Sequence, residues 1–301
     1  MAAERMEREF PRWPRILASL ARTAFWLLLI AIVLLQLSAS GGADKARGDV
    51  LHRFEQERGS RVIALIHRQD TASLFGVPVA SSISIEDSEA LLRAIRLTPP
   101  EQPIDIILHT PGGLVLAAEQ IARALLERKA KVTAFVPHYA MSGGTLIALA
   151  AHEIVMDSNA VLGPVDPQIG SLPAASIVRA ADMKGTQAED QLLIMADIAR
   201  KARAQIGASV TQLLEKHMAA EQARDLATTL SEGRWTHDYG ITAEAARGFG
   251  LKVSIAMPRT VYELMDMYPQ GAGRRPSVLY TPVRMPPELR DPDSRSPEKK
   301  P

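Results

Sequence analysis

Short apolar runs alternate with amphipathic segments through the middle of the chain, and this pattern predicts strands and helices in turn. The runs with the length and composition of buried strands are 61–66, 104–108, 132–136, 153–156 and 160–163. The segments with helical spacing are 84–97, 114–128 and a third that ends near residue 151. Such alternation is typical of crossover units, so we predict an α/β protein with a mostly parallel sheet.

A longer helical pattern follows these elements. Residues 174–232 are rich in Ala, Leu and Gln and have long helical periodicity, which predicts a helical arm inserted before a short return segment at 235–253. The chain becomes rich in proline and arginine beyond Pro269, and residues 283–301 are predicted to form a disordered tail. We therefore expect one folded domain, at 42–282, that contains the arm.

The first 41 residues have the pattern of a basic segment followed by a membrane anchor. Residues 24–40 carry no charge, and a helix of this length spans about 25 Å, close to the roughly 30 Å of a hydrocarbon core. The arginines that precede it are Arg5, Arg8, Arg12, Arg15 and Arg22. The positive-inside rule then predicts a single-pass protein of the cell membrane, with a cytoplasmic N-terminus and an extracytoplasmic folded domain.

A cleavable signal peptide is the alternative interpretation of this segment. Ser38-Ala39-Ser40, which precedes Gly41, is an acceptable small-residue cleavage site. Under either interpretation, residues 41–49 are expected to form a polar connection to the folded domain.

Composition and charge exclude several classes of protein. The 301 residues are 47% hydrophobic and 23% charged, as in a globular protein with one good-sized core. A net charge of +1 argues against a dedicated nucleic-acid-binding protein, which needs a basic face. The absence of cysteine excludes disulfides, thiolate metal sites and cysteine nucleophiles.

Two glycine turns carry the candidate chemistry. His109-Thr110-Pro111-Gly112-Gly113 follows one predicted strand, and Met141-Ser142-Gly143-Gly144 follows the next. Open α/β sheets bind their ligands at the carboxyl ends of parallel strands, so both turns are expected at one site. One turn offers backbone amides without side chains, and the other offers a serine between small residues.

The order and spacing of these motifs resemble a known family. Thr110-Pro111-Gly112-Gly113 is followed by 140–145 (AMSGGT) and 163–168 (GPVDPQ), and then by 233–236 (GRWT) after the arm. Together they resemble the Clp-protease/crotonase fold, its signal-peptide-peptidase-A branch, and most closely the membrane-anchored serine dehydrogenase proteinases. The resemblance covers about 62–282. It implies an ATP-independent serine endopeptidase that acts on membrane-associated or unfolded polypeptides and forms a homo-oligomer through the arm.

The residues themselves support a nucleophile and an oxyanion hole. Ser142 would stand at the positive end of a helix beside free amides, although a plain N-cap serine is the alternative. The resemblance nominates the amides of Gly113 and Gly143 as oxyanion donors. Gly112, Gly144 and Asp166 are candidates for the substrate groove, Asp166 also being able to orient a lysine or to form a turn.

The base that would activate Ser142 is less evident. Clp-type peptidases use a histidine about 25 residues after the serine, where this chain has Asp166-Pro167-Gln168. The signal-peptide-peptidase relatives use a lysine at the start of the arm, and Lys184 matches that position. A desolvated lysine can act as a neutral base. Lys201 is the reserve candidate, although its arginine neighbours favour a solvated helix face.

Other readings of the sequence remain open. No group of residues has metal-ligand spacing, and no glycine motif matches a nucleotide loop, so neither a metal nor a cofactor is expected. His237-Asp238 is predicted to be a structural turn rather than a catalytic pair. A crotonase-type acyl-CoA enzyme would need a carboxylate, for which only Glu119 and Glu153 lie nearby. A catalytically silent scaffold is the second alternative.

Overall fold

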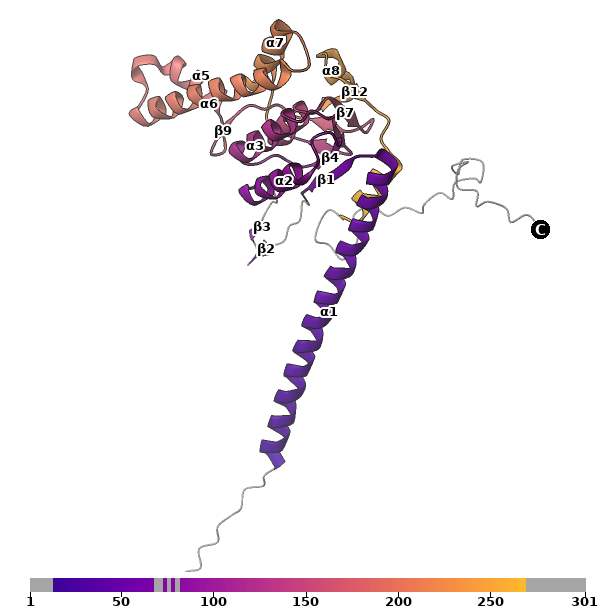
Figure 1. Cartoon of the computed structure of the whole chain (residues 1–301). Coiled ribbons are helices and arrows are strands. Elements are labelled where there is room, and N and C mark those ends of the chain that lie inside the picture. Colours follow the sequence, from indigo (N-terminus) through magenta and orange to yellow (C-terminus); the bar gives the residue numbers. More distant parts are fainter. Residues whose placement is uncertain (1–12, 68–72, 75–76, 79–81, 269–301) are drawn as a thin grey trace, which may run out of the picture.

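A computed structural model describes residues 13–67, 73–74, 77–78 and 82–268 (Figure 1). The helices are α1 (Trp13–Arg58), α2 (Ile85–Leu97), α3 (Val115–Leu126), α4 (Gly143–Leu149), α5 (Ala174–Lys184), α6 (Asp190–Leu214), α7 (Ala220–Ser231), α8 (Ala243–Gly248) and α9 (Arg259–Asp266). The strands are β1 (Arg61–Ile66), β2 (Ser73–Leu74), β3 (Val77–Pro78), β4 (Ile104–His109), β5 (Val132–Val136), β6 (Tyr139–Ala140), β7 (Glu153–Met156), β8 (Val161–Leu162), β9 (Gln168–Ile169), β10 (Leu172–Pro173), β11 (Ile241–Thr242) and β12 (Val253–Ser254).

The central sheet is parallel, as predicted. Its strand order is β1-β4-β5-β7-β12, and each neighbouring pair runs in the same direction. A small second sheet, β11-β8-β6, lies beyond the end of β5. Every residue of β4 and β5 is buried, which is why apolar residues occupy both faces of these strands in the sequence.

Alternate residues of the strands face two different layers. Ile106 of β4 and Ala134 of β5 belong to the core that α2, α3 and α4 cover, whereas Ile107 and Phe135 belong to a smaller cluster on the other face. The last turns of α1 cover that second face together with α9, and the rings of Phe54 and Phe135 meet edge to face. The sheet is therefore sandwiched, with α1 and the C-terminal helix on one side.

Helix α2 illustrates how the sequence sets the ends of these elements. Ser84 caps the helix by accepting a hydrogen bond from the amide of Asp87, whose carboxylate accepts one from the amide of Ser84 in return. This reciprocal capping box satisfies two of the amides that a helix start leaves unpaired. The helix ends before Pro99-Pro100, as predicted.

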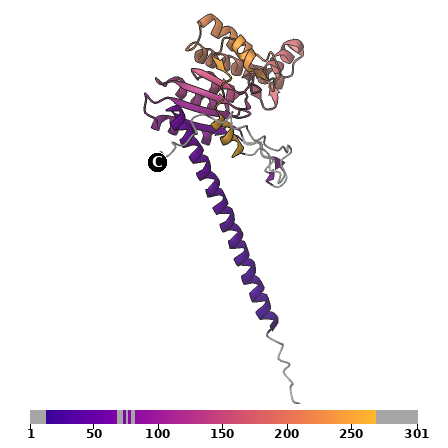
Figure 2. The same cartoon turned by 90° about the vertical axis from the view of Figure 1, so that its right-hand side faces the viewer.

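The predicted arm consists of α5, α6 and α7. It extends from the sheet in the direction opposite to α1, as both views show (Figures 1 and 2). The C-terminal part of α6 and α7 contribute Ile206, Leu213 and Leu226 to the main core. The outer part, where α5 packs on α6, has a small core of its own.

Helix α1 differs from the prediction for residues 41–49. These residues continue the helix without interruption instead of forming a polar connection. The side chains of Asp44 and Arg47 pair one turn apart, and Val50 and Phe54 bury the next two turns against the sheet. Helical pairing followed by burial explains why the helix does not end at Gly41-Gly42.

The predicted anchor at 24–40 forms part of α1, but most of its second half lies outside the residues whose side chains are described. Phe25, Trp26 and Ile30 are exposed on the described half. Within the part of the chain that the structure describes, no helix reaches the length and apolarity of a membrane span. The predicted tail at 283–301 lies outside the described residues.

Candidate active site

The two glycine turns lie side by side, as predicted from their positions after β4 and β5. Thr110 and Ala140 form a parallel bridge between the turns. The amide of Thr110 donates to the carbonyl of Tyr139 over 3.2 Å, and the amide of Met141 donates to the carbonyl of Thr110 over 3.0 Å. This pairing fixes the serine turn against the Pro-Gly-Gly turn at the carboxyl edge of the sheet.

Ser142 has a strained backbone, and its hydroxyl does not cap the helix that follows. Its φ is 49° and its ψ is −115°, and it is the one non-glycine residue with positive φ in the part of the chain that the structure describes. It occupies the N-cap position of α4, yet its side chain makes no capping hydrogen bond. Strain of this kind costs about 1–3 kcal/mol and collects at functional sites. A strained serine between a strand and a helix is the geometry of an exposed nucleophile.

Two amides converge beside Ser142. Gly143 is the first residue of α4, so its amide has no acceptor within the helix. A Cβ placed on Gly143 would lie 3.7 Å from the Gly113 nitrogen, which shows how close the two residues are. Gly113 is exposed, and its amide donates no hydrogen bond within the described residues. Together with the positive end of α4, the two donors form a site suited to a developing negative charge.

The other glycines allow the turns to approach each other. A Cβ on Gly112 would lie 2.8 Å from the Cβ of Ser142, and one on Gly144 would lie 2.5 Å from Cγ2 of Thr110. Both glycines are buried, and neither lines the cavity next to Ser142. Of the three predicted groove residues, the structure therefore brings only Asp166 to this cavity.

A cavity of about 160 Å³ opens beside Ser142, Gly113 and Gly143. The side chains that make its apolar walls are Val115, Leu146, Val165 and Ile206. Its polar end is formed by Asp166, Gln168 and His237. An apolar pocket with a few convergent polar groups is typical of a ligand or substrate site.

The polar end contains a pairing that the sequence did not predict. Asp166 is 4% exposed, and its two carboxylate oxygens accept from Nδ1 of His237 over 2.8 Å and from Nε2 of Gln168 over 2.7 Å. His237 therefore pairs with a carboxylate 71 residues away and not with its neighbour Asp238. In the neutral tautomer that donates from Nδ1 to the Asp166 carboxylate, Nε2 is the ring nitrogen with a free lone pair.

Neither predicted lysine lies at this cavity within one chain. Lys184 is the last residue of α5 and is exposed on the arm. Lys201 is also exposed and pairs with Asp197 one turn away over 2.5 Å, as expected of a solvated helix face. The structure thus brings together Ser142, Gly113, Gly143 and Asp166, and leaves Lys184 apart from them.

The two glutamates considered for the crotonase alternative also lie elsewhere. Glu153 begins β7, at the opposite end of the sheet from the glycine turns, and its hydrogen bond from Lys131 lowers the pKa of its carboxyl group. Glu119 lines a groove between α3 and α6 but not the Ser142 cavity. No carboxylate of the crotonase type therefore faces Ser142 from these two positions. In the described part of the chain, no three potential ligands group around a metal position.

Two curated proteins are similar in sequence to most of this chain. The chain is 54% identical over 233 residues to the uncharacterized protein MJ1495 of Methanocaldococcus jannaschii, covering 77% of this chain and 80% of that protein. It is 51% identical over 259 residues to MJ0137 of the same organism, covering 86% of this chain and 91% of the relative.

A solved structure of the 1510-N membrane-bound stomatin-specific protease also matches. The match has a TM-score of 0.41 and 23% identity, and it covers 62% of this chain and 79% of that one. A family model described as ClpP-like SDH-type serine proteinase matches residues 14–295. Because that match spans nearly the whole chain, the protein belongs to the family of ClpP-like SDH-type serine proteinases.

Proposed function

We propose that the chain is a serine endopeptidase whose nucleophile is Ser142. The observation that carries this proposal is the strained serine, without a capping hydrogen bond, next to the amides of Gly113 and Gly143. The base takes the hydroxyl proton of Ser142 as its oxygen attacks the peptide carbonyl, and the amides of Gly113 and Gly143 stabilise the oxyanion that forms. The protonated base then donates to the leaving amine, and water hydrolyses the acyl-enzyme.

Lys184 is the base that we propose, and its position requires a second copy of the chain. An exposed lysine at the end of α5 can reach a Ser142 cavity only if the arm of another subunit covers that cavity. The exposed apolar side chains Met183, Leu193 and Ile194 near the arm's outer end support a subunit contact there. Burial in that contact would desolvate the lysine and favour its neutral form.

His237 is the competing base within a single chain. Its Nδ1 is held by the buried carboxylate of Asp166, which is the arrangement that orients a catalytic histidine. A homo-oligomer is needed for the Lys184 mechanism and not for the His237 mechanism, so the two make different predictions.

Cleavage of casein by the full-length protein in detergent tests the proposal. We expect Ser142→Ala and Lys184→Ala to lose activity while they remain folded, and Lys201→Ala to retain it. Labelling of Ser142 by a fluorophosphonate probe reports the nucleophile independently of the substrate. A wild-type protein that neither cleaves casein nor reacts with the probe would support the scaffold alternative instead.

Mixing two inactive variants distinguishes the candidate bases. In a mixed oligomer of Ser142→Ala and Lys184→Ala chains, a site can combine Ser142 of one chain with Lys184 of the other. Recovery of activity on mixing supports the two-chain dyad. If Lys184→Ala is active alone and His237→Gln is not, His237 is the base.

We further propose that residues 24–40 anchor the protein in the cell membrane and that its substrates are membrane-associated or unfolded polypeptides. The charge-free run and the arginines before it support the anchor, and the family supports polypeptide substrates. Alkaline extraction of membranes tests the anchor, because a spanning helix resists it. Reporter fusions after Ser40 and after Pro301 test which side of the membrane holds the folded domain.

A further inference from the structure

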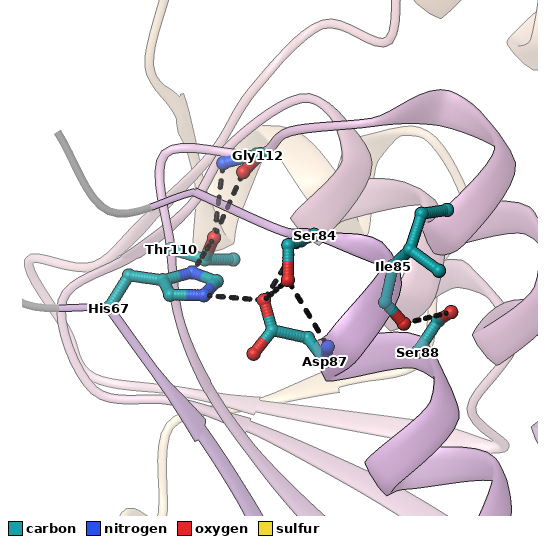
Figure 3. Close-up of polar contacts among 7 residues, drawn as sticks. All are labelled: His67, Ser84, Ile85, Asp87, Ser88, Thr110 and Gly112. Atoms are coloured by element: carbon teal, nitrogen blue, oxygen red, sulfur yellow. Dashed lines mark hydrogen bonds and ion pairs between the residues drawn. The ribbon is translucent and has the colours of Figure 1, made fainter. Parts of the chain in front are cut away.

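A buried histidine lies behind the turn that carries the Gly113 amide. His67 directly follows β1, is 5% exposed, and donates its amide to the carbonyl of His109 over 2.8 Å. Its ring contacts two side chains from different elements, as Figure 3 shows: Nδ1 lies 2.7 Å from Oγ1 of Thr110, and Nε2 lies 3.3 Å from Oδ2 of Asp87. His67 therefore joins the start of α2 to the glycine turn.

The Thr110 hydroxyl connects this ring to the turn. Oγ1 accepts a hydrogen bond from the amide of Gly112 over 3.1 Å, while the Gly112 carbonyl lies 3.4 Å away (Figure 3). Since the Asp87 carboxylate is an acceptor, the neutral His67 ring carries its proton on Nε2. Nδ1 then accepts the Thr110 hydroxyl hydrogen over the shorter of the two available distances.

Backbone contacts from the start of α2 hold the same turn. The amide of Ile83 donates to the carbonyl of Gly112 over 2.7 Å, and the amide of Leu114 donates to the carbonyl of Ile83 over 2.9 Å. A Cβ on Gly113 would lie 2.4 Å from the Ile83 nitrogen and oxygen, so Gly113 packs directly on that backbone. The Asp87 oxygen that faces His67, Oδ2, also accepts a hydrogen bond from the amide of Ser84, the residue that follows Ile83.

We propose that His67 is a positioning residue for the oxyanion hole, acting through Thr110 on the direction of the Gly113 amide. This inference rests on the proposed function of Ser142. The ring contacts neither the nucleophile nor the cavity, since His67 does not line it. The His67 ring holds the Thr110 hydroxyl in place, and that hydroxyl accepts from the amide of Gly112. The following amide, that of Gly113, is thereby kept directed at the position where the oxyanion forms. Small displacements of such donors reduce turnover strongly.

Two substitutions at His67 separate its two contacts. The side chain of His67→Asn offers an oxygen near the Nδ1 position and keeps the link to Thr110. The side chain of His67→Gln reaches the Nε2 position and keeps the link to Asp87. We expect His67→Gln to lower kcat for casein-derived peptides between about tenfold and a hundredfold with little change in KM, and His67→Asn to lower it less.

Thr110 provides the second pair of variants, in case the His67 variants do not fold. Thr110→Val removes the hydroxyl at nearly constant volume, whereas Thr110→Ser retains it. We expect Thr110→Val to lower kcat as His67→Gln does and Thr110→Ser to restore most of it. His52→Gln is the matched control, because His52 is an exposed histidine on α1 whose Nδ1 pairs with Glu55 in the same helix.

The fluorophosphonate probe separates this inference from the proposed function. If the wild type does not react, the Ser142 proposal fails. If the wild type reacts, and folded His67→Gln and Thr110→Val variants match its kcat and labelling rate, the positioning role of His67 is wrong while Ser142 stands.

Discussion

The sheet with its glycine turns and the outer arm differ in how much of their apolar surface is buried within one chain. Helix α4 and the inner face of α3 bury their apolar residues in one core with β4 and β5, and Ile121 of α3 has no exposed surface. On the arm, by contrast, Met183 is 82% exposed and Ile194 is 62% exposed. The core is stabilised by contacts within one chain, whereas the arm has apolar surface suited to contacts with another.

Truncating one isoleucine in each region gives the largest expected contrast. Ile121→Ala removes buried methyl groups and leaves a cavity, so we expect the free energy of unfolding to fall by about 4 kcal/mol. Ile194→Ala should change it by less than about 0.5 kcal/mol in the isolated chain, because little surface is buried there. Urea denaturation of both variants measures the difference. Equal losses would mean that the arm is as tightly packed as the core.

Glycine substitutions sharpen the same comparison. Gly113→Ala would bring its Cβ within 2.4 Å of the Ile83 backbone, so we expect a loss of about 3 kcal/mol in stability. Gly185 of the arm has φ of 51° but no atom within 4 Å of an added Cβ, so Gly185→Ala should cost about 1 kcal/mol through backbone strain alone. Thermal unfolding followed by circular dichroism compares the two. A neutral Gly113→Ala would show that Ile83 can move away.

A charge on the arm tests whether its exposed face contacts another subunit. Ile194→Asp should weaken self-association by about tenfold or more, since it buries a carboxylate in an apolar contact. Light scattering over a concentration series measures the mass of the protein. Glu221→Asp on α7 provides a control at an exposed position that is already acidic. An unchanged mass series for Ile194→Asp would place the subunit contact elsewhere.

The smallest effect is expected at the junction between arm and core, where His217 should make the stability of the folded chain depend on pH. His217 follows α6 and faces His152, and burial together with that neighbour lowers the pKa of His217 below its ordinary value of 6.5. The folded chain thus prefers the neutral ring, and its stability should decline as the pH falls below 6.5, where the unfolded chain binds the proton first. Urea denaturation at pH 7.5 and 5.5 should show a smaller decline for His217→Gln than for the wild type.

The sequence predicted the elements whose causes are local. The run 104–108 has the length and apolar composition that predict a buried strand, and β4 covers Ile104–His109. The helical spacing of 84–97 predicts a helix from Ser84, and Ser84 caps α2. The carboxyl-edge position of the two turns followed from the alternation of strands and helices.

The features that the sequence missed depend on distant residues or on backbone angles. Asp166 and His237 meet because the whole arm loops out between them, and no local pattern announces such a pairing. The positive φ of Ser142 has no residue signature, since serine rarely adopts it. The helix through 41–49 depends on Val50 and Phe54 meeting the sheet, whereas Gly41-Gly42 alone favours an interruption.

Because α1 is uninterrupted, it fixes both the spacing and the orientation between its two ends. Its 46 residues rise about 1.5 Å each and turn by about 100° each. Fixing the beginning of this helix in place therefore sets two quantities. One is the distance of the sheet from that point along the helix axis, and the other is the direction about that axis in which the Ser142 cavity faces. Adding one residue to the helix before Val50 would move the sheet by only about 1.5 Å along the helix axis, but it would rotate the cavity about that axis by about 100°.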